Sequence, residues 1–123
     1  MARLRTLLVP LVFVGAGVAL SACGSGGAVS DARSACVQVK AALALEKQAQ
    51  SAGLASSAGQ ALAGRAMSTL LAASGAAAQA TSSDGSWNVL QTTIQEAERV
   101  PISNLTPALT RICQVADSST PYL

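Results

Sequence analysis

The chain contains no histidine and few aromatic or charged residues. Its 123 residues include one Trp, one Tyr and one Phe, and 11% are charged. Without histidine it lacks the commonest general base, the usual metal ligand and the central member of a Ser-His-Asp triad. Its unclustered basic residues and scarce aromatics are poorly suited to neutralising phosphates or stacking on bases. We therefore expect no metal ion, no cofactor and no nucleic-acid partner.

Carboxylates are also too few and too scattered to suggest catalysis. The closest pair of the six, Glu96 and Glu98, lies two positions apart, so the two side chains would diverge on a helix. A glycosidase pair would have to be assembled by folding. Neither a Gly-x-x-x-x-Gly-Lys phosphate loop nor a Gly-x-Ser-x-Gly elbow occurs. The sequence predicts a protein that is not an enzyme.

The first 22 residues have the pattern of a signal peptide. Arg3 and Arg5 precede an apolar run of 14 residues, 7–20. A helix that spans a bilayer needs about 20 apolar residues, so this run is short for a permanent anchor and suits a cleaved leader. We therefore predict a signal peptide over residues 1–22.

Leu20-Ser21-Ala22-Cys23, at the end of this leader, resembles the lipobox of bacterial lipoproteins. The resemblance covers only the leader. It implies cleavage between Ala22 and Cys23 and a diacylglyceryl group on the Cys23 sulfur, which would hold the protein on the extracytoplasmic side of the cell membrane. Palmitate-type acyl chains contribute about 0.8 kcal/mol per buried methylene, so two chains anchor stably. The alternative is an ordinary signal peptide, cut nearby, that leaves Cys23 as a spare thiol.

The part that follows the leader divides into a linker, one domain and a tail. Gly24-Ser25-Gly26-Gly27 has the composition of a flexible spacer, so we predict a lipidated linker over residues 23–30. The helical domain is expected over 31–117 and an irregular tail over 118–123. Without Arg3 and Arg5, six basic residues balance six acidic ones.

The first helix is predicted to start at Ser30 or Asp31 and to run to about Ser51, before Gly53. Its basic residues recur at intervals of seven, as on a solvated face; the other interpretation is a docking face for an acidic partner. These residues are Arg33, Lys40 and Lys47. The apolar side is expected to contain Cys36, Val39 and Leu43, flanked by Val37, Ala41, Ala44 and Leu45.

Residues 54–80 are rich in alanine and interrupted by glycines, which predicts a broken or closely packed helix. The small side chains would either let backbones approach closely or leave room for an apolar ligand. We expect a helix end and a loop over residues 72–83, with capping residues at 81–85.

Two further helices are predicted near the C-terminus. The first is ended by Pro101, and Thr106-Pro107 has the form of an N-cap and first helical position for the second. Trp87 heads the first apolar stripe and is expected in the core, although it could instead stack on a sugar or a partner. The two stripes consist of Trp87, Leu90, Ile94 and Ala97, and of Leu109, Ile112, Cys113 and Ala116.

If Cys23 carries lipid, two cysteines remain. Cys36 and Cys113 are then the natural disulfide of an exported chain, and in the chain-entropy model a loop of 77 positions contributes roughly 4.5 kcal/mol. That contribution matters because only 22 of the 101 residues after the leader are large and apolar. The alternatives are two buried free thiols or, without a Cys-x-x-Cys arrangement, an unusual redox pair.

The sequence therefore predicts an all-α protein, a small bundle of three to four helices with a disulfide between the first and last. We expect a membrane-anchored, non-catalytic binding or structural module of the cell envelope, whose partners are the membrane, through its lipid, and another envelope protein. The alternative is a carrier of a small apolar or lipid ligand. A cavity of about 300 Å³ or more lined by residues 54–80 would favour the carrier.

Overall fold

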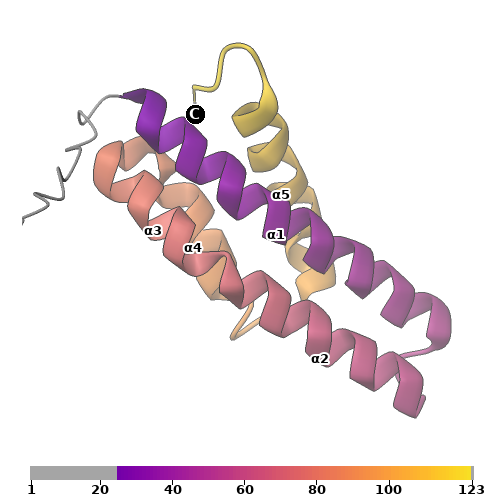
Figure 1. The fold of residues 1–123 in the computed structure, drawn as a ribbon. Coiled ribbons are helices and arrows are strands. Elements are labelled where there is room, and N and C mark those ends of the chain that lie inside the picture. The colour runs from indigo at the N-terminus through magenta and orange to yellow at the C-terminus, as the bar shows by residue number, and fades with distance from the viewer. Residues whose placement is uncertain (1–24, 123) are drawn as a thin grey trace, which may run out of the picture.

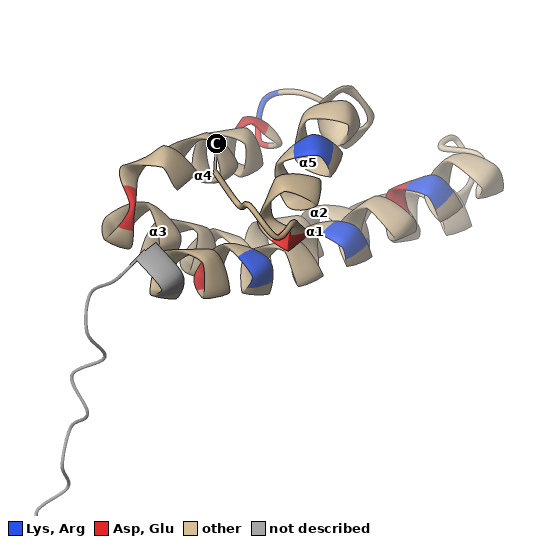
Figure 2. Ribbon diagram, turned by 90° about the horizontal axis from the view of Figure 1, so that it is seen from above, with Lys and Arg blue, Asp and Glu red and all other residues tan. Residues whose placement is uncertain are grey.

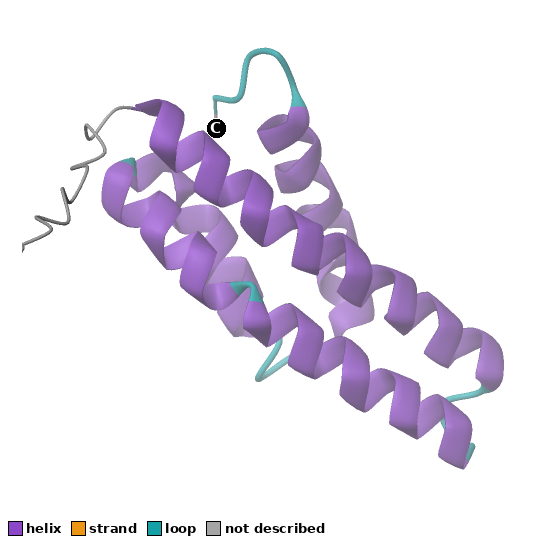
Figure 3. Ribbon diagram, in the orientation of Figure 1, coloured by secondary structure: helices purple, strands orange, loops and turns teal. Residues whose placement is uncertain are grey.

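A computed structural model describes residues 25–122, and this part of the chain is helical without any strand (Figures 1 and 3). The predicted leader and Cys23 lie outside the described residues. The elements are α1 (Ser25–Ala52), α2 (Ser57–Ala72), α3 (Ser74–Ser83), the 3-10 turn η1 (Gly85–Trp87), α4 (Asn88–Glu96) and α5 (Ile102–Asp117).

The predicted small helical bundle is confirmed. Only Ala73 separates α2 from α3, and its backbone keeps helical angles, so the two run end to end as one broken rod along α1 (Figure 1). Within residues 25–122 the bundle therefore consists of four rods: α1, α2 with α3, α4, and α5. None of the helices in this range is both long enough and apolar enough to cross a bilayer.

Helix α1 starts earlier than predicted. It begins at Ser25, so residues 25–30, assigned to the flexible linker, are its first turns. Ala28 is fully buried there and belongs to the core, which explains why the helix extends toward the N-terminus despite its glycines. The predicted end is correct, because the helix stops at Ala52 and Gly53 adopts a left-handed φ of 88°. If Cys23 is lipidated, the bundle begins two residues from the anchor.

The predicted loop over residues 72–83 is wrong, because α3 occupies most of it. Ala77 and Ala80 are fully buried in the core, and alanine has the highest helix propensity, so burial and propensity agree. Asp84, within the predicted capping residues 81–85, is the N-cap of η1. The backbone N–H of Ser86 donates to Asp84 Oδ1 at 3.0 Å, and this bond holds the pKa of the Asp84 carboxyl below its usual value.

Helix α5 also starts before its predicted cap. It begins at Ile102, and Pro107 lies inside it rather than at its first position. Burial of Ile102 explains the earlier start, because that side chain extends the apolar stripe by two turns. Pro107 has no N–H, so the carbonyl of Ser103 lacks the usual helical donor. Thr106 is not an N-cap: its hydroxyl donates to the Ile102 carbonyl at 3.1 Å.

The core is built on alanine. Half of the twenty residues in the main buried cluster are alanines, and four of these belong to α1. Larger side chains fill the centre, where Trp87 is 1% exposed and so is a core residue as predicted. Val37, expected beside the apolar side of α1, is 65% exposed instead. The largest fully buried side chains are Trp87, Leu70, Leu90, Ile94, Leu109, Val39, Cys36 and Cys113.

Gly59 permits a close approach between α1 and α2. A Cβ atom at this position would lie 1.9 Å from the Gly53 carbonyl oxygen and 3.1 Å from that of Ala49. The turn is also tied by Ser56, whose hydroxyl oxygen accepts from the Gly59 N–H at 3.0 Å. Of the two expectations for the small residues of 54–80, the structure therefore supports close backbone packing.

Cys36 of α1 and Cys113 of α5 form a disulfide, as predicted, with their Cα atoms 5.5 Å apart. Charged groups hold the same two helices together. Arg33 Nε donates to the Ala116 carbonyl at 2.7 Å, and Lys40 pairs with Asp117. A cation at the carbonyl end of a helix is favourable because the helix dipole is negative there. Arg33 and Lys40 therefore bond to α5 while they remain exposed, as Lys47 also is, so the predicted solvated face of α1 is confirmed.

Replacing both Cys36 and Cys113 by alanine should lower the free energy of unfolding by about 3–5 kcal/mol, because the unfolded chain loses its largest constraint. Urea denaturation followed by circular dichroism measures this loss. A reductant should destabilise the wild type by a similar amount and leave the variant unchanged. An unaltered denaturation midpoint in the variant would contradict a structural role for the bridge.

Gly59→Ala should lower the free energy of unfolding by about 2–3 kcal/mol, since the new methyl group overlaps backbone atoms that cannot rotate away. Gly64→Ala is the matched control in the same helix, because its Cβ would meet nothing within 4 Å. It should stabilise the protein by about 0.5–1 kcal/mol through helix propensity. The measurement is thermal or urea unfolding, and equal effects at the two glycines would refute the close approach.

Candidate functional site

A groove of about 500 Å³ lies between the C-terminal half of α1 and the middle of α5. Helix α5 crosses α1 and is bonded to it near its own C-terminal end, whereas the groove lies toward its other end (Figure 1). Both walls are helices, so the side chains that line the groove sit on rigid supports. They are Leu43, Ala44, Glu46, Lys47 and Gln50 of α1 and Thr106 and Thr110 of α5.

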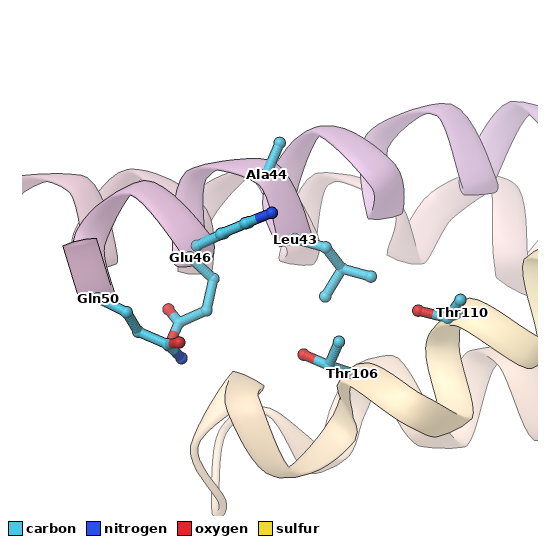
Figure 4. Close-up of a pocket in the computed structure, with 7 residues that line it drawn as sticks. Leu43, Ala44, Glu46, Gln50, Thr106 and Thr110 are labelled. Carbon is cyan, nitrogen blue, oxygen red and sulfur yellow. The ribbon is translucent and has the colours of Figure 1, made fainter.

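Glu46 is the unusual residue of this groove. It is 8% exposed, and no other charged residue among those that the structure describes is buried. Its carboxylate points from α1 toward α5, and its Oε1 accepts a hydrogen bond of 3.2 Å from Gln50 Nε2 (Figure 4). The ion pairs of residues 25–122 join Lys40 to Asp117 and Arg99 to Glu96, so Glu46 has no cationic partner there. Buried charges are usually paired, which makes this one a candidate binding group.

The other groups of the groove mix apolar and polar chemistry. Leu43 extends from α1 toward α5, and Thr106 and Thr110 extend back from α5 (Figure 4). The Thr106 hydroxyl proton is used by the Ile102 carbonyl, which leaves lone pairs of its oxygen available as acceptors. An acidic group beside an aliphatic wall and hydroxyls can bind a ligand that carries hydrogen-bond donors and an apolar stem.

Sequence reasoning did not identify Glu46. A usable signal was present, because Glu46 continues the apolar stripe of Cys36, Val39 and Leu43 at the next helical step. A carboxylate on a buried face is rarer than one on a solvated face, and this contrast could have singled it out. Its neighbours from α5 could not be foreseen, since they come from a helix that lies more than fifty residues further along the chain.

The residues that the sequence predicts to be functional do not gather in one site. Cys36 and Cys113 are brought together, whereas Ala22 and Cys23 lie outside the described residues. Lys47, the third member of the basic series, lines the groove. Basic and acidic positions are distributed over several of the described helices (Figure 2). Glu96 and Glu98 are both exposed, and no group of three or more potential metal ligands occurs in residues 25–122.

Comparison with known proteins gave no match: neither a family model, nor a curated protein, nor a solved structure resembles the chain significantly.

Glu46→Met should leave the free energy of unfolding unchanged or raise it by up to about 1 kcal/mol, because the stability of the fold does not depend on a buried charge with one neutral hydrogen-bond partner. Glu98→Met removes the same charge at an exposed position and is the control. It should change the free energy of unfolding by less than about 0.5 kcal/mol. Urea denaturation measures both. A loss above about 1 kcal/mol in Glu46→Met alone would mean that Glu46 serves folding rather than binding.

Proposed function

We propose that this protein is a lipid-anchored, non-catalytic binding module of the bacterial cell envelope, and that it binds its partner in the α1–α5 groove. The observation that carries the proposal is Glu46, a buried carboxylate in a groove of ligand size that no cation of the described chain neutralises. Binding sites are typically preformed hollows with a few well-placed polar groups, and the groove has this character.

Two features support the location in the envelope. The Leu20-Ser21-Ala22-Cys23 motif resembles a lipobox. The Cys36–Cys113 disulfide suits an oxidising compartment outside the cytoplasm, since such bonds are rare in cytosolic proteins. The start of α1 at Ser25 then leaves a short connection to the anchor, so the domain would stay close to the membrane surface.

The absence of histidine from the chain and the single carboxylate of the groove favour binding over catalysis. The alternative role as a carrier of an apolar ligand has less support. The groove is lined by side chains of α1 and α5, among them the charged Glu46 and Lys47, and residues 54–80 do not contribute to it. The alanines that the carrier hypothesis would place around a ligand, such as Ala66, Ala73 and Ala77, instead pack in the core.

The proposal predicts position-dependent crosslinking in the cells that produce the protein. A photoreactive amino acid in place of Thr110, on the groove, should give a discrete crosslinked product in the membrane fraction. The same amino acid in place of Gln95, an exposed position on α4, is the matched control and should not give that product. Cys23→Ser should remove the protein from the membrane fraction, and mass spectrometry of the wild-type protein should find an acylated N-terminal cysteine.

The two parts of the proposal can fail separately. An unacylated N-terminus, or a Cys23→Ser protein that stays on the membrane, would refute the lipid anchor. Products that are the same from positions 110 and 95, or no product from position 110, would refute binding of an envelope partner in the groove.

A further inference from the structure

The lining of the groove specifies a chemistry for its ligand. Within residues 25–122 the Glu46 carboxylate accepts one hydrogen bond, at Oε1. Its other oxygen, Oε2, is therefore free to accept. Gln50 uses its amide nitrogen for that bond, so its own carbonyl oxygen is free as well. Two acceptors, one of them charged, therefore stand side by side on α1 (Figure 4).

The facing helix adds further acceptors. Thr106 and Thr110 carry hydroxyl oxygens on the α5 side of the groove, and the Thr106 hydroxyl already donates to its own helix. An alkylammonium group has three donors and no acceptor, so it can bond to a carboxylate, an amide oxygen and a hydroxyl oxygen at once. Its methylene stem would lie along Leu43, the large apolar side chain of the lining.

Other ligand classes fit this lining less well. A divalent metal ion needs several carboxylate, carbonyl or imidazole ligands, and residues 25–122 contain no group of three potential metal-ligating side chains. A purely apolar ligand would remove water from the Glu46 charge without replacing its hydrogen bonds, which is unfavourable. Lys47 also lines the groove and would repel a ligand that carries several positive charges. It would attract a carboxylate or carbonyl oxygen located elsewhere on a ligand that has a single ammonium group.

From this complementarity we infer that the α1–α5 groove binds the alkylammonium side chain of a lysine-type residue in a peptide, with Glu46 as its counter-ion. The inference rests on the proposed binding function and names the group that the partner presents. Glu46 and Gln50 accept from the ammonium group, Leu43 contacts its stem, and Thr106 and Thr110 close the other side.

The test uses the processed, lipidated protein in detergent micelles, with Nα-acetyl-lysine amide as the probe. Backbone amide NMR shifts of residues 43–50 and 106–110 report binding up to about 50 mM probe, a range that detects even weak affinity. Nα-acetyl-norleucine amide has a similar aliphatic stem without the ammonium group and serves as the control ligand. We expect the lysine probe to shift these amides and the norleucine probe to bind at least about tenfold more weakly, in line with one charge-assisted hydrogen bond.

Glu46→Gln keeps the size of the side chain and removes its charge, so it should weaken binding of the lysine probe at least about tenfold. Glu98→Gln makes the same charge change at an exposed site and should alter the affinity less than about twofold. Circular dichroism spectra and melting curves establish that both variants fold. Equal binding of the two probes, equal affinity of the two variants, shifts confined to other surfaces, or no binding at all would each overturn the inference.

These outcomes are distinguishable from failure of the proposed function. A crosslinked product from position 110 that survives Glu46→Gln would retain the binding module and reject the lysine-type ligand. Binding of the lysine probe without any crosslinked product would retain the chemistry of the groove and reject an envelope partner at this site.

Discussion

The contact between α1 and α5 is the constraint on which the rest of the structure depends. A chain with so few large apolar side chains gains little from burying each residue, and the core is correspondingly rich in alanine. The Cys36–Cys113 bond closes most of the domain into one loop and fixes the last helix against the first. Arg33 and Lys40 add bonds to the carbonyl end of α5, so one end of this helix pair is held covalently, by hydrogen bonds and by charge.

Alanine gives this bundle a different packing from one built on leucine. Small side chains contribute little area individually, but they let helix axes approach and so recover contacts between backbones. The α1–α2 turn is the tightest such contact, where Gly59 leaves no space for a side chain beside Gly53. The central cluster around Trp87 supplies the large side chains that an alanine interface cannot provide. Close approach and a compact centre together compensate for the small apolar volume.

The groove follows from the same arrangement. Helix α5 crosses α1 and is bonded to it near one end, which leaves space between the two helices toward the other end. Pro107 removes a backbone hydrogen bond from that part of α5. Glu46 occupies this space, where its carboxylate is almost covered and yet has one neutral hydrogen-bond donor. Glu46 forms no ion pair within residues 25–122, and this observation is the basis of its proposed role in binding.

The helical class, the disulfide and the end of α1 could be predicted without a structure. Helical spacing of apolar residues, two remaining cysteines and Gly53 are local or compositional signals, so they are readable without a structure. The predicted starts of the helices were less accurate. Tertiary burial of Ala28, Ala77 and Ile102 extended helices through glycines, a predicted loop and a proline, where local preference favoured an interruption.

The surroundings of Glu46 and the partners of the basic residues of α1 depend on how the helices pack. Seven-residue spacing places Arg33, Lys40 and Lys47 on one side of α1 but cannot say whether that side faces water or another helix. In the structure the three side chains stay exposed to water, and α5 lies near enough to give Arg33 and Lys40 bonding partners and to place Lys47 on the groove. Periodicity is a property of one helix, whereas a groove between helices is a property of two.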